Sequence, residues 1–122
     1  MAVSSITSAD FESTVTGNDI VLVDVWATWC QPCLRFAPVY EKVSDKHPDA
    51  TFTKIDFDEN NDLATQFGIS AVPTLLAFRE GVMVFNQAGA LSGPQLDEVV
   101  TKIKELDMEA IHAEVERLQA EG

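Results

Sequence analysis

The chain has 122 residues, of which 46% are hydrophobic and 23% charged; this composition is typical of one globular domain and excludes a disordered chain. Its 20 acidic and 8 basic side chains give a net charge of −12, which disfavours binding to nucleic acid or to an anionic membrane surface. The two cysteines, Cys30 and Cys33, are too few for a disulfide-dense secreted scaffold.

Two elements are predicted before the cysteine pair. Residues 8–15 predict a short helix with Ser8 as its N-cap, ended by Gly17-Asn18. Residues 20–27 (IVLVDVWA) are rich in β-branched side chains and almost continuously apolar. That pattern is typical of a central strand that is covered on both faces.

After the pair, apolar spacing predicts three helices and three strands. In chain order these are helix 34–46, strand 51–57, helix 61–67, strands 74–79 and 82–86, and a helix that starts near Pro94 and runs through Ile103. Pro38 lies inside the first of these helices and should bend it. The two adjacent strands predict an antiparallel hairpin. This order predicts an α/β fold, with a mixed sheet and helices on both of its faces.

The N-terminal region lacks the features of a targeting segment. The first basic side chain is Arg35, so no charged region of a signal peptide is present. The apolar run 20–23 is interrupted by Asp24 and is too short to span a bilayer. We therefore expect a cytoplasmic protein that does not bind membranes. Thiols stay reduced there, so a close cysteine pair is expected to be catalytic, redox-sensing or metal-binding rather than structural.

Cys30 and Cys33 lie where the buried strand passes into a helix. Cys30 falls at the helix N-terminus, where free N–H groups and the helix dipole favour a thiolate. Cys33 lies about one turn further on, on the same side and more buried. One thiol can attack a substrate disulfide while the other resolves the mixed disulfide. A zinc site is the alternative, but the remaining candidate ligands, His47 and His112, lack ligand spacing to the pair.

The residues around this pair resemble the thioredoxin family. The matching segments, in family order, are VDVWATWCQPC at 23–33, Ala37-Pro38, Lys54-Ile55-Asp56 with Asp58, Gly68-Ile69, Val72-Pro73-Thr74 and Gly89-Ala90. They cover residues 5–106, nearly the whole chain. The resemblance implies a thioredoxin fold, a central mixed β-sheet flanked by helices on both faces, in a domain of residues 1–106.

The resemblance also implies catalytic roles. Cys30 is the attacking thiolate, Cys33 the resolving cysteine, and Asp24 the buried carboxylate that takes the proton of the resolving thiol through water. Burial beside apolar side chains independently predicts a raised pKa for Asp24, suited to proton transfer near neutrality. Lys54 matches the lysine that supports this carboxylate. The alternative is that Asp24 and Lys54 form a purely structural buried ion pair.

Pro73 matches a cis-proline that faces the cysteine pair. A cis bond there would turn the backbone groups of Val72 outward, so that an extended substrate could pair with them as an added strand. The alternative is an ordinary trans turn. Further residues implied in substrate docking or in the redox motif are Trp29, Gln31, Pro32, Gly89 and Ala90, whereas Trp26 is expected to pack in the core.

Gln31 departs from the family, which usually has glycine between the first cysteine and the proline. Because Gln31 adds no cation beside the thiolate, we expect a reductant rather than an oxidant. Residues 25–40 contain no acidic side chain, so an uncharged docking face is expected around the pair.

The second departure is a C-terminal helical extension, residues 107–122. Apolar residues repeat at helical spacing in an acidic segment, at Met108, Ile111, Val115 and Leu118. This stripe is out of phase with the preceding helix, which predicts a break near Asp107. We expect the extension to fold back on the domain of a monomer. The alternative is weak self-association through this helix, although two heptads are too few for a stable isolated coiled coil.

Together these features predict a protein-disulfide reductase in electron transport and cell redox homeostasis, re-reduced by an NADPH-dependent thioredoxin reductase and acting on disulfide-containing client proteins. No bound cofactor or metal is expected, since the chain has no Gly-rich phosphate loop; the redox group is a Cys30–Cys33 disulfide. One alternative is a thioredoxin-fold chaperone or protein-binding module with incidental redox activity. A weaker alternative is an oxidase or isomerase.

Overall fold

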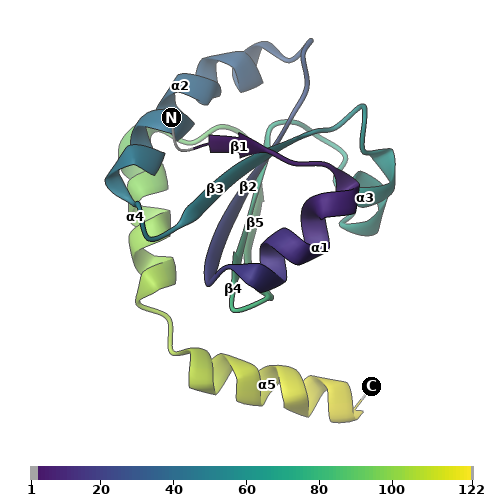
Figure 1. Ribbon diagram of the computed structural model, residues 1–122, viewed down its shortest axis with the longest axis vertical. Coiled ribbons are helices and arrows are strands. Elements are labelled where there is room, and N and C mark those ends of the chain that lie inside the picture. Colours follow the sequence, from purple (N-terminus) through teal and green to yellow (C-terminus); the bar gives the residue numbers. More distant parts are fainter. Residues whose placement is uncertain (1–2, 122) are drawn as a thin grey trace.

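A computed structural model describes residues 3–121 of the protein, in five strands and five helices (Figure 1). In chain order the elements are β1 (Val3–Ser5), α1 (Ser8–Gly17), β2 (Ile20–Trp26), α2 (Gln31–Lys46), β3 (Thr51–Asp56), α3 (Asn61–Gln66), β4 (Thr74–Arg79), β5 (Val82–Ala88), α4 (Gly93–Lys104) and α5 (Met108–Glu121). Residues 1, 2 and 122, which belong to the expected segments 1–106 and 107–122, lie outside the described residues.

The strands form one mixed sheet in the order β1-β3-β2-β4-β5. β2 occupies the centre, parallel to β3 and antiparallel to β4, and β4 and β5 form the predicted hairpin. Six of the seven residues of β2 are buried, because a central strand with helices on both sides has no face left for water. The mixed sheet with helices on both faces confirms the predicted thioredoxin fold.

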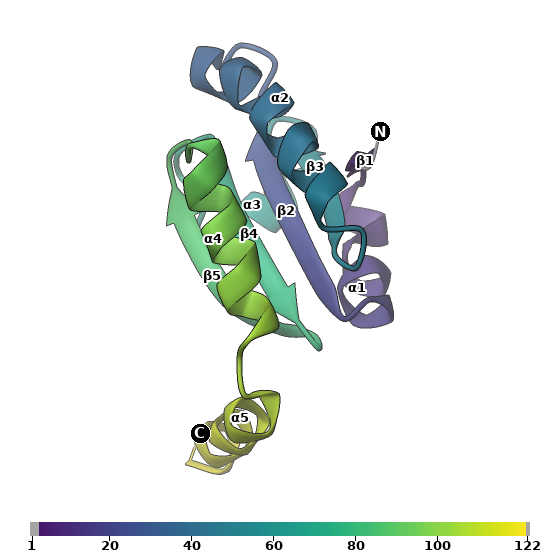
Figure 2. The ribbon, with the colours of Figure 1, turned by 90° about the vertical axis from the view of Figure 1, so that its left-hand side faces the viewer.

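Alternation along β2 divides the core into two layers. Val21, Val23 and Val25 point to the layer formed with α1 and α3, and Leu22 points to the layer formed with α2 and α4. Figures 1 and 2 show these helix pairs on opposite faces of the sheet. The same alternation places Asp24 on the Leu22 side, under α2.

One strand is added to the predicted elements, and the ends of several others shift by one to three residues. The edge strand β1 is additional; its three residues pair with β3, and so short a segment carries no readable alternation. α2 begins at Gln31, three residues before the predicted start, because Pro32 in the first turn has no N–H to lose and is compatible with a helix there. β5 extends two residues further, to Ala88.

The prediction of Ser8 as N-cap is wrong. Thr7 holds that position, without a side-chain cap bond, and Ser8 is the first residue of α1. The Ser8 amide donates to Asn60 Oδ1 at 2.8 Å, and its hydroxyl donates to Asp62 Oδ1 at 2.7 Å. Ser8 therefore joins the start of α1 to the start of α3, a partnership across more than fifty residues that local sequence cannot reveal.

α5 is set apart from the rest of the protein. The chain leaves helical geometry after α4 and re-enters it at Met108, which confirms the predicted break near Asp107. Met108 is the one buried residue of this helix, His112 Nε2 lies 2.8 Å from Glu80 Oε1 of the hairpin, and Leu118 is 54% exposed. In Figure 1, α5 lies beyond the end of the sheet, away from the other four helices. No helix within residues 3–121 is both long and apolar enough to cross a membrane.

Candidate active site

Cys30 and Cys33 form a disulfide at the junction of β2 and α2, with their Cα atoms 5.2 Å apart. Cys30 lies at the N-terminus of α2, as predicted, where it is the N-cap residue, and Cys33 lies in the first turn. The exposed fractions are 4% for Cys30 and 2% for Cys33, so the expected order of burial holds by a small margin. Both sulfurs sit in an apolar cluster that includes Ala27.

Two backbone groups face the Cys30 sulfur. The Cys33 N–H donates to Cys30 Sγ at 3.2 Å, and the Val72 carbonyl oxygen lies 3.6 Å from the same sulfur. In the reduced protein, the amide and the helix N-terminus stabilise a thiolate. The carbonyl oxygen can accept a hydrogen bond only from the neutral thiol. In the reduced protein, the Cys33 N–H is thus a donor to the Cys30 thiolate, and the Val72 carbonyl oxygen is an acceptor for the neutral Cys30 thiol.

Asp24 is buried in the middle of the sheet, in register with Lys54 of β3 and Leu75 of β4. Burial raises its pKa from the ordinary 3.8 to about 7, and the Lys54 charge opposes this rise. Its Oδ1 has no hydrogen-bond partner within residues 3–121. Among the described residues no ion pair within 4.0 Å joins Asp24 to Lys54. The Lys54 ammonium instead lies 5.3 Å from the centre of the Trp26 ring.

A small cavity adjoins Asp24. Its volume is about 30 Å³, and its lining includes Tyr40 and Ala37 of α2 as well as Lys54. This volume is large enough for one water molecule, and Asp24 and Lys54 would supply its polar partners. The Tyr40 hydroxyl is engaged elsewhere, because it donates to the Thr53 carbonyl oxygen at 2.7 Å. The carboxylate is thus shielded from bulk solvent yet can reach a single water.

The predicted cis bond is present between Val72 and Pro73. Pro73 is buried and Val72 half-buried, beside the cysteine pair. The Gly89 N–H donates to the Pro73 carbonyl oxygen at 2.8 Å, and Gly89 has a φ of +101°, a conformation that favours glycine. Gly89 and Ala90 are exposed. The loop after β5 is therefore held against the segment that faces Cys30.

Trp29, Gln31 and Pro32 are exposed around the pair, and Trp29 is 62% accessible. The Trp29 Nε1–H donates to Asp58 Oδ2 at 2.7 Å. The expectation of an uncharged docking face is therefore wrong, since Asp58 brings a carboxylate to it from the loop after β3. A signal existed in the sequence: the carboxyl ends of parallel neighbours such as β2 and β3 meet at one sheet edge, so residues that follow them come together.

The two histidines lie outside this site. His47 Nε2 is 2.6 Å from Asp97 Oδ1, and its Nδ1 is 2.7 Å from Lys104 Nζ. His112 contacts Glu80 at the far end of the sheet. Within residues 3–121 no group of three or more His, Cys, Asp or Glu side chains is arranged to hold a metal ion.

A family model, related sequences and solved structures to which this chain is similar are all described as thioredoxins. The family model described as Thioredoxin matches residues 2–105. A thioredoxin-named protein of Streptomyces coelicolor is 45% identical over 117 residues, 96% of this chain and 87% of its own. The thioredoxin of Listeria monocytogenes is 41% identical over 101 residues, 82% of this chain and 97% of its own. The solved structure of a mutant thioredoxin of Halobacterium salinarum superimposes with a TM-score of 0.80 at 33% identity, covering 85% of this chain and 92% of that one.

Proposed function

The chain belongs to the thioredoxin family and is a protein-disulfide reductase, and from this premise we propose how its residues carry the reaction. The Cys30 thiolate attacks one sulfur of a client disulfide and forms a mixed disulfide, releasing the first client sulfur as a thiolate. Cys33, once deprotonated, attacks Cys30 Sγ and releases the second client sulfur. Two electrons pass to the client, and the Cys30–Cys33 disulfide remains.

The observation that carries this assignment of roles is the hydrogen bond from the Cys33 amide to Cys30 Sγ. It stabilises negative charge on the Cys30 sulfur and so favours the thiolate that attacks the client disulfide. Cys33 has no comparable donor among the hydrogen bonds described for residues 3–121 and is the less exposed of the two. Cys30 is therefore the nucleophile and Cys33 the resolving thiol.

Asp24 is proposed to accept the proton of Cys33 through a water molecule. A carboxyl with a pKa of about 7 is a competent base near neutral pH and can afterwards release the proton to a departing client thiolate. Lys54 acts as a positioning residue, because its charge limits the rise in the pKa of Asp24.

Clients are proposed to dock on the surface formed by Trp29, Gln31, Pro32, Val72, Gly89 and Ala90, with the buried Pro73 presenting the backbone of Val72 through its cis bond. Val72 offers backbone groups beside Cys30 to an extended segment, and such pairing does not depend on the client sequence. Trp29, the exposed residue before Cys30, adds apolar area to this surface. The site would accept disulfides from many proteins.

The proposed direction is reduction of clients in the cytoplasm, as part of electron transport to disulfides, with re-reduction by an NADPH-dependent thioredoxin reductase. Gln31 supports this direction, since it places no cation beside Cys30. The equilibrium constant against glutathione tests it. A reduction potential below that of the glutathione couple is expected, and a potential above it would assign the protein to the oxidases or isomerases.

Asp24→Asn is expected to slow resolution of the mixed disulfide several-fold above pH 7, because asparagine cannot accept the Cys33 proton. In the wild type, resolution should accelerate as pH rises through about 7, where Asp24 ionises, and this inflection should be missing in the variant. Stopped-flow measurement with a client disulfide across pH 6 to 9 records both effects.

Asp45→Asn is a matched control, since Asp45 is an exposed carboxylate on α2 and the substitution removes the same charge. It should keep the wild-type profile. An unchanged profile in Asp24→Asn would remove Asp24 from the mechanism.

We also propose that residues 1–106 form the thioredoxin domain and residues 107–122 a separate helical extension. The family match ends at residue 105, which supports this boundary. The Streptomyces coelicolor relative aligns with 117 of the 122 residues. An alignment of that length must include positions 107–117, so the relative also has residues that correspond to most of the extension.

Deleting residues 107–122 is expected to leave insulin reduction within about twofold of the full chain and to cost on the order of 1–2 kcal/mol, since Met108 is the one buried residue lost. Light scattering of both forms should give the mass of a monomer. A mass above that of a monomer for the full chain, but not for the deleted form, would establish self-association through α5. Loss of activity would instead favour the alternative, a binding module whose extension holds clients.

A further inference from the structure

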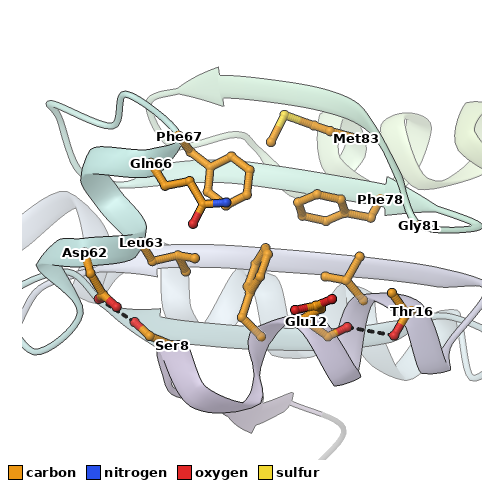
Figure 3. Close-up of a pocket in the computed structure, with 12 residues that line it drawn as sticks. Ser8, Glu12, Thr16, Asp62, Leu63, Gln66, Phe67, Phe78, Gly81 and Met83 are labelled. Carbon is orange, nitrogen blue, oxygen red and sulfur yellow. Dashed lines mark hydrogen bonds between the residues drawn. The ribbon is translucent and has the colours of Figure 1, made fainter. Parts of the chain in front are cut away.

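A second cavity lies between α1, α3 and the β4–β5 hairpin, far from the dithiol. Its volume is about 460 Å³, which falls in the range of small-molecule sites. Phe78, which lines it, pairs with Val21 near the start of β2, whereas Cys30 follows the opposite end of that strand. Figure 3 shows its side chains gathered around an open space. The cavity is therefore separate from the active site.

The floor of this cavity is aromatic. The Phe11 ring centre lies 5.3 Å from that of Phe67 and 5.4 Å from that of Phe78, and the last two are 6.1 Å apart. The rings are tilted by 54° to 79° to one another, so none is stacked face to face. Met83 adds a polarisable thioether. Phe11 and Phe78 are buried, and Phe67 is the most accessible of the three rings. The face of an aromatic ring carries partial negative charge and attracts cations that also make apolar contact.

The rim of the cavity is acidic. Its charged side chains are Glu12 and Asp62, and neither takes part in an ion pair described within residues 3–121. The Ser8 hydroxyl donates to Asp62 and lowers the pKa of that carboxyl, so Asp62 stays ionised. Figure 3 shows Glu12 across the opening from Phe67 and Phe78. The cavity therefore combines two carboxylates, Glu12 and Asp62, with a lining of three phenylalanine rings.

We propose that this cavity binds small organic cations, in which an ammonium group is carried on an aromatic or hydrocarbon body. The body would contact the rings and Met83, and the ammonium group would lie near Glu12 and Asp62. Anions are repelled by these carboxylates and by the net charge of −12. Neutral molecules of the same shape gain the apolar contact alone. This proposal is independent of the disulfide chemistry.

Three probes of matched shape test the ligand class: 2-phenylethylammonium, 2-phenylethanol and phenylacetate, titrated into the ¹⁵N-labelled protein. The cation should cause saturable shifts in backbone amide signals of α1, α3 and the hairpin. The alcohol should bind about tenfold more weakly and the anion not measurably, because the cation–π and carboxylate attractions are lost or reversed. Raising the salt concentration should weaken binding of the cation and leave that of the alcohol unchanged.

Two double variants that change the net charge equally separate a local from a global effect. Glu12→Gln with Asp62→Asn should weaken cation binding about three- to tenfold. Glu109→Gln with Glu116→Gln, two exposed acids of α5, should leave it unchanged. Absence of saturable shifts, equal affinity for all three probes, or the same affinity in both double variants would each overturn the proposal. The salt series in the wild type stands even if a variant folds poorly.

Discussion

Cys30→Ser is expected to lower the rate of protein-disulfide reduction by at least about 10³-fold, because a serine hydroxyl is not ionised near neutral pH and cannot form a mixed disulfide. The fold should survive, since serine can replace cysteine as the N-cap of α2. Insulin precipitation driven by dithiothreitol measures the rate. A variant whose curve matched that of the wild type would remove the dithiol mechanism.

Cys33→Ser is the companion variant, which separates attack from resolution. It keeps the Cys30 nucleophile and lacks the resolving thiol, so a covalent adduct with the client should accumulate. Mass spectrometry without reductant should detect one client chain per protein, and Cys30→Ser should give none. Adducts in Cys30→Ser and none in Cys33→Ser would reverse the two roles.

Asp24→Asn is expected to stabilise the protein by on the order of 4 kcal/mol at pH 8, although it slows the reaction. The folded pKa of Asp24 is about 7, against 3.8 for the ordinary carboxyl. Between these values the native state holds a proton that the unfolded state has released, so stability is highest below pH 4 and falls as pH rises through 7. The loss is about 1.4 kcal/mol for each pH unit of the shift.

Asparagine escapes this cost because it does not ionise. Urea unfolding at pH 4, 6 and 8 should therefore show a gain in the free energy of unfolding that grows with pH and is small at pH 4. Asp45→Asn, the exposed control, should show no such growth. An equal gain at all three pH values would mean that Asp24 does not carry the raised pKa on which its role as a base depends.

The fold was predictable where the signal was local or repeated. The run of β2, apolar except for Asp24 and rich in β-branched residues, is typical of a strand buried on both faces, and the hairpin follows from two strand-like runs joined by Glu80-Gly81. β1 was not predictable, because it consists of three residues whose pairing with β3 depends on a strand some fifty positions away. Ser8 illustrates the same limit, since its partners are Asn60 and Asp62 rather than its own helix.

The active site also has features that the sequence predicted and one that it did not. The spacing of Cys30 and Cys33 in a strand-to-helix junction predicted both the chemistry and the position of Cys30 at the helix N-terminus. The raised pKa of Asp24 also followed from a carboxyl in an apolar strand. The contact between Trp29 and Asp58 was missed because the expectation rested on the composition of residues 25–40 and did not use the edge that β2 and β3 share. The absence of acidic residues from 25–40 concerns one segment of the chain. The docking face also includes residues from other segments, such as Asp58, so its charge could not be predicted from that segment alone.

The arrangement of the sheet also bears on how the protein is made. Val72, which faces Cys30, comes 42 residues later in the chain. Synthesis runs from the N-terminus, so the segment from β2 to β3 leaves the ribosome before the wall of the site exists. During that interval both thiols are present without the Val72–Pro73 segment that encloses them. Enclosure of the two thiols therefore waits for the pairing of β4 with β2, which brings Val72 and Pro73 to the site.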